Sequence, residues 1–214
     1  MAKAASATLT RDRAIEPERT ALLLVDVQNA VVNDRQAAIR PEFDAVARTI
    51  VLPNLVKLVG ASRAARLEII YTVMANLTRD GRDRSLDYKL SGISIAKGSW
   101  DARVLDVVAP GEDELVLPKT SSSVFNSTNI DYLLRNIGIE EVVVTGFLTD
   151  QCIDHTVKDA ADRGYYVTAI RDACMANTRA RHEAALACFS GYCRTVTTAE
   201  FLKLLSGRRQ YASA

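Results

Sequence analysis

Three side chains able to do acid–base and nucleophilic chemistry stand at the ends of predicted strands. Asp26 follows the apolar run ALLLV, Lys119 follows LVLP, and Cys152 comes six residues after the glycine of EVVVTG. Parallel strands bring their carboxyl ends to one edge of a sheet, and ligands bind there. We therefore expect these side chains to meet at that edge, where the thiol could act as a nucleophile and the carboxylate as its base.

Cys152 lies in the first turn of a predicted helix, residues 151–163. The positive end of the helix dipole and the free backbone N–H groups favour the thiolate there, and the same N–H groups could bind an oxyanion. The competing interpretation is a small buried hydrophobe, as most free cysteines are. The other three cysteines lack this setting and are predicted to be structural, reduced thiols: Cys174, Cys188 and Cys193.

Asp26 and Lys119 each have an ordinary as well as a catalytic interpretation. A carboxylate that ends an apolar strand is half-desolvated, so the pKa of Asp26 should rise and make it a competent base; alternatively, it caps the next turn. Lys119 could hold the Asp26–Cys152 pair electrostatically, or it could be a surface lysine. His155 lies on the same helix as Cys152 and cannot easily act as its base. No zinc, phosphate-loop, dinucleotide or serine-hydrolase motif occurs, so we expect no metal and no cofactor.

The elements that must position these groups alternate between strand and helix. Strands are predicted at 21–25, 67–73, 115–117, 141–145, 165–170 and 193–197, and helices at 43–66, 127–137, 151–163, 179–189 and 199–205. This alternation is typical of an α/β fold with a mainly parallel sheet. A mixed-charge segment from Thr78 to Lys97 interrupts the pattern, and we expect a solvated loop there rather than a loop that covers the site and supplies a cation.

Composition excludes several classes of protein. The chain has 214 residues, a formal net charge of +1 and 48% hydrophobic residues, which suits one domain with a substantial core. It has no bulk positive charge for nucleic acid, no apolar run of about 20 residues for a membrane and no secretory signal pattern, so we expect a cytoplasmic protein. We expect a flexible leader at 1–17, whose role in targeting stays open, a domain at 18–206 and a tail at 207–214.

Three segments together resemble the isochorismatase-like cysteine hydrolase superfamily. They are LLLVDVQNAVV (22–32), LPKTSSSVFNST (117–128) and VVVTGFLTDQCIDHTVKDAADRGY (142–165). The resemblance covers about residues 18–206, and each of the three motifs stands at a predicted strand end. It implies a three-layer α-β-α, Rossmann-like architecture around a mainly parallel six-stranded sheet, in chains that usually form homo-oligomers.

The resemblance also implies a catalytic triad and its surroundings. Cys152 would be the nucleophile, Asp26 the base, and Lys119 would support both. The backbone N–H groups of Leu148 and Cys152 would form an oxyanion hole, next to a cis peptide bond between Phe147 and Leu148. Beside Leu148, the candidates for substrate binding are the following residues: Asn76, Phe125 and Gln151.

The activity that this resemblance implies is hydrolysis of a C–N bond in a small carboxamide or carbamoyl compound, through a thioester. An alternative is isochorismatase chemistry, in which Asp26 protonates a vinyl ether and the cysteine is dispensable. A third is a scaffold domain with a residual triad. Nicotinamidase members carry an Asp-x-His type metal site after the second strand, and YTVMANLTRDGRD (71–83) contains no histidine, which disfavours that activity.

Overall fold

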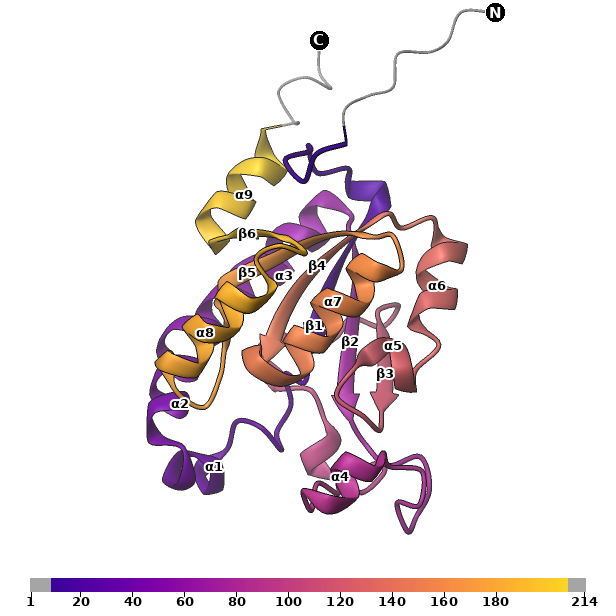
Figure 1. Ribbon diagram of the computed structural model, residues 1–214, viewed down its shortest axis with the longest axis vertical. Coiled ribbons are helices and arrows are strands. Elements are labelled where there is room, and N and C mark those ends of the chain that lie inside the picture. Colours follow the sequence, from indigo (N-terminus) through magenta and orange to yellow (C-terminus); the bar gives the residue numbers. More distant parts are fainter. Residues whose placement is uncertain (1–8, 208–214) are drawn as a thin grey trace, which may run out of the picture.

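One parallel sheet of six strands organises the protein in the computed structural model, which describes residues 9–207 (Figure 1). The strands lie in the order β3-β2-β1-β4-β5-β6, and every neighbouring pair is parallel. Their bounds are β1 Thr20–Val25, β2 Glu68–Met74, β3 Leu115–Lys119, β4 Glu141–Phe147, β5 Tyr166–Met175 and β6 Arg194–Val196. The predicted α/β fold with three layers is confirmed.

Helices cover both faces of the sheet. The α-helices are α1 Asp34–Ile39, α2 Pro41–Val46, α3 Leu52–Ala65, α4 Leu86–Leu90, α5 Val124–Ser127, α6 Ile130–Ile137, α7 Asp154–Asp162, α8 Arg179–Phe189 and α9 Thr198–Ser206. Side chains alternate along a strand, so Leu22 and Leu24 of β1 pack with α2, α3 and α9. Ala21 and Leu23 pack on the opposite face with α6, α7 and α8. All of β1 is buried, which explains its uninterrupted apolar sequence.

The two halves of the chain meet at the centre of the sheet, where β1 pairs with β4. Strands β2 and β3 follow on one side of this pair, and β5 and β6 follow on the other. Such a reversal of strand order opens a crevice beyond the carboxyl ends of the central strands. In Figure 1 the arrowheads of β2, β3 and β4 point to the end that carries α1 and α4, and α9 lies at the other end.

The helix predicted over 43–66 is one continuous helical stretch that changes its winding in the middle. A π-helical turn, Ala47–Val51, joins α2 to α3, and Pro53 stands directly after this turn, in the first turn of α3. Among the described residues, the stretch Pro41–Ala65 is long and apolar enough to cross a membrane by length and composition. Its buried side chains pack against the sheet, as those of a core helix do.

Other predicted elements need correction at their ends. The helix predicted over 127–137 is two helices, α5 and α6, and β5 extends five residues beyond its predicted end at 170. The helix that carries Cys152 begins with a π-helical turn, η5 (Thr149–Ile153), before α7.

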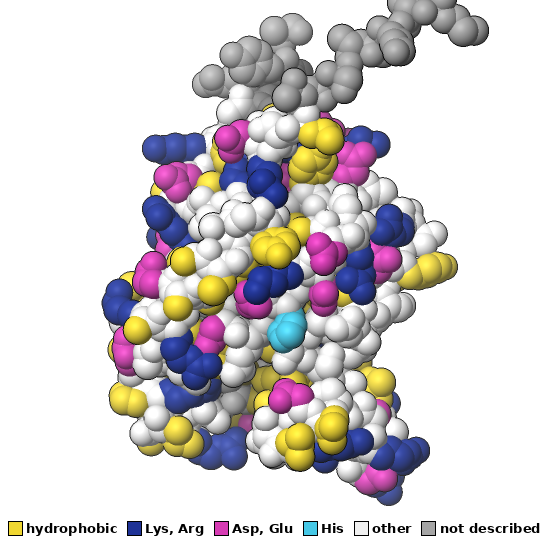
Figure 2. Space-filling model, viewed as in Figure 1, with side chains coloured by type: hydrophobic (Ala, Val, Ile, Leu, Met, Phe, Trp, Pro, Cys, Tyr) yellow, Lys and Arg dark blue, Asp and Glu magenta, His cyan; other side chains and the backbone are white. Residues whose placement is uncertain are grey.

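The predicted leader and tail lie partly outside the described residues, so the domain limits stay predictions. In the described part of the leader, Ile15 is buried in the core. The visible surface carries acidic and basic side chains interspersed, in keeping with the balanced charge (Figure 2). Cytoplasmic location and assembly into homo-oligomers also stay predictions.

Candidate active site

Asp26 is held in an unusual backbone conformation directly after β1. Its φ is 56°, in the left-handed region that side chains other than glycine rarely adopt. Its amide donates to the Thr72 carbonyl of the neighbouring strand at 2.9 Å, and the residue is 1% exposed. Strain of this kind persists where the surrounding structure fixes it, and it concentrates at functional sites.

Gly146 lets β4 approach the end of β1 closely. Its φ is 111°, and a Cβ placed there would lie 2.1 Å from the Val25 carbonyl oxygen, so no other residue fits. Val25 immediately precedes Asp26, and β4 leads to Cys152. The close approach therefore sets the distance between the two strand ends that carry the carboxyl and the thiol.

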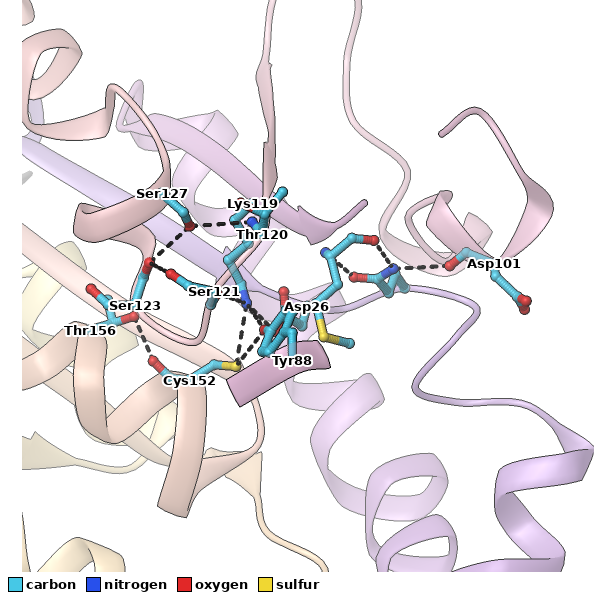
Figure 3. Close-up of polar contacts among 12 residues, drawn as sticks. Asp26, Tyr88, Asp101, Lys119, Thr120, Ser121, Ser123, Ser127, Cys152 and Thr156 are labelled. Atoms are coloured by element: carbon cyan, nitrogen blue, oxygen red, sulfur yellow. Dashed lines mark hydrogen bonds and ion pairs between the residues drawn. The ribbon is translucent and has the colours of Figure 1, made fainter. Parts of the chain in front are cut away.

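Lys119, the last residue of β3, lies at the centre of the site (Figure 3). Its side chain is fully buried, and its Nζ lies 2.9 Å from Asp26 Oδ2 as an ion pair. Nζ also donates to Cys152 Sγ at 3.4 Å, to Tyr88 OH at 3.0 Å and to the Ser121 carbonyl at 3.0 Å. The structure thus brings the three strand-end side chains together, and the interpretation of Lys119 as a surface lysine is wrong.

Cys152 lies in the π-helical turn η5, 5% exposed. Two neighbouring side chains of α8 hold the residues just before it. His182 Nδ1 and Thr149 Oγ1 are 2.8 Å apart, and Arg181 forms an ion pair with Asp150. The position of the nucleophile therefore depends on α8 as well as on the end of β4.

Burial dominates the electrostatics of the site. It raises the pKa of Asp26, although Lys119 opposes the rise, which confirms the direction predicted from the strand end. Burial would lower the pKa of Lys119, but attraction to Asp26 and the other acidic neighbours raises it. Each member of the pair therefore favours the charged form of the other. Both Asp26 oxygens are buried, and the Lys119 ammonium and the Cys152 thiol are the groups that interact with them by hydrogen bonding.

The pKa of the Cys152 thiol shifts in a direction that differs from the prediction. Burial raises the pKa of Cys152 to about 12; Lys119 lowers it and Asp26 raises it again. The pKa shift is therefore opposite in direction to the one expected at a helix start, because the loss of water at the thiol outweighs its attraction to the Lys119 ammonium. The thiol needs a base, and Asp26 is the adjacent one.

Tyr88 is a fourth member of the site that sequence reasoning missed. It lies on α4, 3% exposed, with its hydroxyl 3.0 Å from Lys119 Nζ and 3.9 Å from Cys152 Sγ. Because the lysine donates to the hydroxyl oxygen, the hydroxyl proton is free to point at the sulfur. One aromatic residue among charged ones, in SLDYKL (85–90), was the only available signal.

A pocket of about 550 Å³ opens onto Asp26 and Cys152. Its walls also include Ala30, Val31, Arg35, Gln36, Ile39, Arg40, Met74, Gly92, Ile93, Ser94, Ile95, Asp101, Phe147, Leu148 and Gln151. The volume suits a small molecule. A larger hollow of about 1800 Å³, lined in part by Arg66 and Lys203, includes none of the three strand-end side chains.

The predicted binding residues divide into two groups. Leu148 and Gln151 line the pocket, and the Phe147–Leu148 peptide bond is cis, as the resemblance implies. Asn76 is buried beside the pocket and donates to Ser94 Oγ at 3.1 Å, whereas Phe125 packs against Tyr165. Neither of these two lines the pocket, and their contact with substrate stays a prediction.

The mixed-charge region corrects another expectation. We call residues 77–99 the covering segment, because it contains Tyr88 and the wall Gly92–Ile95. Its arginines Arg79 and Arg82 do stay in solvent, but the opposite side of the segment packs over the site. The interpretation as a merely solvated loop is therefore wrong, since charge composition reports only the outward side of such a segment.

Comparisons with known proteins show the family to which the chain belongs. The family model described as isochorismatase domain matches residues 20–201. The ureidoacrylate amidohydrolase RutB of Pantoea ananatis is 31% identical over 73% of this chain and 69% of its own length. A cysteine hydrolase from Pseudomonas syringae pv. phaseolicola superposes with a TM-score of 0.81 at 25% identity, over 91% of this chain and 96% of that one.

The N-carbamoylsarcosine amidase of Thermoplasma acidophilum superposes with a TM-score of 0.70 at 26% identity, over 84% of this chain and 96% of that one. The family match covers the whole sheet and all three strand ends that form the site. The chain is an enzyme of the isochorismatase family, a family of hydrolases acting on small molecules.

Proposed function

We propose that the protein is a cysteine-dependent amidohydrolase that cleaves a C–N bond of a small carboxamide or carbamoyl compound through a thioester. One observation carries the proposal. The Lys119 ammonium contacts both Asp26 and the Cys152 sulfur, and these two residues line a pocket of small-molecule size. This arrangement pairs a nucleophile with a base and holds the charge that develops on each of them.

The first step moves a proton from Cys152 to Asp26. The raised pKa of Asp26 makes it a stronger base than an ordinary carboxylate. The sulfur gains negative charge as it attacks the substrate carbonyl carbon, and two donors lie beside it. Lys119 Nζ is 3.4 Å away and the Tyr88 hydroxyl 3.9 Å away. Lys119 loses its carboxylate partner when Asp26 is protonated, and the new thiolate replaces that partner.

The second step breaks the C–N bond. The backbone N–H groups of Leu148 and Cys152 are the proposed donors to the tetrahedral oxyanion. Asp26 returns its proton to the departing nitrogen, which leaves as ammonia or an amine, and the acyl group stays on Cys152. Water then attacks this carbonyl while Asp26 accepts a proton, and the C–S bond breaks to regenerate the thiol.

The relatives support a C–N bond as the target. Those with a named activity include ureidoacrylate amidohydrolase and N-carbamoylsarcosine amidase. Both names contain a carbamoyl group, because a ureido group is a carbamoylated amine. For a carbamoyl substrate the acyl-enzyme is a thiocarbamate, and hydrolysis of that intermediate releases carbamate.

The test is turnover of a panel of ureas and carboxamides, with release of ammonia or amine as the readout. We expect Cys152→Ala to lower kcat by at least about 10⁴-fold, in line with loss of a nucleophile. Cys188→Ser removes the exposed thiol of α8 and is the matched control, expected at wild-type activity. Intact-mass spectrometry of quenched reactions should show the acyl group on Cys152.

The alternative, hydrolysis of a vinyl ether by Asp26 acid catalysis, makes the opposite prediction. Isochorismate turnover that survives in Cys152→Ala and fails in Asp26→Asn would replace the amide proposal. Full activity of Cys152→Ala on an amide would contradict the proposed mechanism directly.

A further inference from the structure

The charged side chains that line the pocket leave one positive charge without a partner. Asp26 is paired with Lys119, and Arg35 is paired with Asp101 at 2.9 Å. The remaining charged residue of the wall is Arg40, at the junction of α1 and α2. No carboxylate of the described residues forms an ion pair with it; the nearby Asp44 carboxylate binds Arg48 instead.

Arg40 is positioned rigidly, with donors to spare. Its Nη1 donates to Asn177 Oδ1 at 3.1 Å and its Nη2 to the Val31 carbonyl at 2.9 Å. Its guanidinium lies over the Phe43 ring, 4.4 Å from the centroid. A guanidinium has five N–H bonds, so two neutral acceptors leave most of them unused. Its Nε is buried and has no partner among the described residues.

A partly buried guanidinium without a carboxylate partner costs free energy unless an anion binds to it. Burial lowers the pKa of Arg40 because the guanidinium has lost water, and Asp44 offsets this only in part. A guanidinium binds a carboxylate through two parallel N–H···O bonds, a geometry that two neutral acceptors do not reproduce. The fixed orientation on Phe43 means that little side-chain entropy is lost when the anion arrives.

We propose that Arg40 binds a carboxylate of the substrate, so that the enzyme acts on ureido or N-carbamoyl acids rather than on neutral ureas or amides. This inference rests on the proposed function and names its substrate class. The carbamoyl group lies at Cys152 and the acid group at Arg40, with a short apolar chain between them along Val31 and Leu148. The Asp26–Lys119 pair is neutral overall, so the carboxylate is attracted to Arg40 rather than to the reacting centre.

The experiment compares acids with neutral ureas of the same shape. The probes are N-carbamoylglycine, 3-ureidopropionate and 4-ureidobutyrate against ethylurea, propylurea and butylurea, which carry a methyl in place of each carboxylate. We expect kcat/KM of the best acid to exceed that of its matched urea by at least about 30-fold, as a charge-assisted bond supplies. Arg40→Gln should reduce the ratio to within about 3-fold, mainly through KM, and Arg40→Lys should retain part of it.

The control is Arg135→Gln, which removes an arginine of α6 that is absent from the pocket wall. It should leave the ratio unchanged, because charge at a distance is screened. Equal turnover of acid and urea by the wild type would overturn the inference and leave the proposed function standing. Arg40→Gln slowing both by the same factor would also overturn it, since a purely structural arginine has that effect.

A second readout does not need turnover. Iodoacetamide labelling of Cys152 at pH 9, followed by peptide mass spectrometry, measures occupancy of the pocket. We expect 3-ureidopropionate to protect Cys152 at concentrations where propylurea does not, and Arg40→Gln to abolish that protection. If no probe is hydrolysed but this pattern holds, the proposed reaction fails and the carboxylate site stands. Equal protection by both compounds, or none, would overturn the site.

Discussion

The strand-end centre consists of Asp26, Lys119 and Cys152, and the covering segment packs over it. The two regions are built in opposite ways. Asp26, Lys119 and Cys152 are buried. Lys119 belongs to a paired strand, Asp26 directly follows one, and Cys152 lies in the turn that follows β4. The covering segment keeps most of its charges in solvent and is closed by local contacts, such as Arg84 Nη1 to the Ile93 carbonyl at 2.8 Å. The centre supplies reactivity, whereas the segment supplies Tyr88 and a wall that exclude water from it.

The largest expected effect on kcat follows from replacing Asp26, the proposed general base of the centre. Asp26→Asn keeps the shape of the side chain but cannot accept the thiol proton, so kcat should fall by about 10²- to 10⁴-fold. Asp172→Asn is the control on β5, where the carboxylate accepts from Thr198 N at 2.7 Å and caps α9. It should lower thermal stability with little change in kcat. An Asp26→Asn enzyme within 5-fold of wild type would remove Asp26 from the mechanism.

The next largest effect is on the free energy of unfolding, which should distinguish a buried ion pair from an exposed ion pair. Lys119→Met leaves the Asp26 charge buried without its partner and should cost about 3–5 kcal/mol of unfolding free energy. Arg19→Met breaks the exposed pair with Glu140 and should cost no more than about 1 kcal/mol. Urea denaturation of both variants measures the contrast. Similar losses of unfolding free energy would mean that the buried Asp26–Lys119 pair contributes no more to stability than an exposed pair does.

The pKa of Cys152, raised to about 12, predicts slow alkylation of this thiol in the free enzyme. The raised pKa keeps the proton on sulfur until strongly alkaline pH, so the iodoacetamide rate should still rise between pH 8 and 10. At pH 7 it should be at least about 100-fold below that of a thiol of ordinary pKa near 8.5. Peptide mass spectrometry separates Cys152 from the exposed Cys188. A plateau reached by pH 8 would contradict the prediction.

A smaller effect tests what the covering segment adds to the chemistry. Tyr88→Phe keeps the ring but removes a hydroxyl placed to donate to the sulfur, so kcat should fall about 10-fold, the value of one hydrogen bond to a charged group. Tyr132→Phe, at an exposed position of α6, is the matched control. If Tyr88→Phe changes KM alone, the tyrosine only shapes the site.

The smallest effect is expected on the outer side of the segment. Arg82 and Asp80 form an exposed pair at 3.0 Å, so Arg82→Gln should change stability by less than about 0.5 kcal/mol and leave kcat/KM unchanged. Thermal unfolding and turnover measure this. A tenfold change in kcat/KM would show that the outer charges take part in binding and would weaken the distinction between the two sides.

The sequence predicts the centre well because buried parallel strands leave a plain signal. Continuous apolar runs mark β1 and β4, and the reactive residue after each run lies at one edge by the geometry of the sheet. The same rule places Lys119, although its burial depends on the covering segment closing over it.

Arg40 and Tyr88 lie beyond sequence reasoning for a different reason. Arg40 stands at the junction of two short helices and Tyr88 stands on a third, and no hydrophobic period specifies the direction of helices this short. The pKa of Cys152 could not be predicted either, because the loss of water at the thiol depends on how tightly several separate elements close around it.

The strand order also determines when the site can form. Asp26 and Lys119 lie at the ends of β1 and β3, which leave the ribosome before β4, and Cys152 follows β4. Until β4 pairs with the open edge of β1, the thiol has no base beside it. Such non-local pairing is slow compared with local folding. A partly synthesised chain therefore contains Asp26 and Lys119 before it has a cysteine that they can activate.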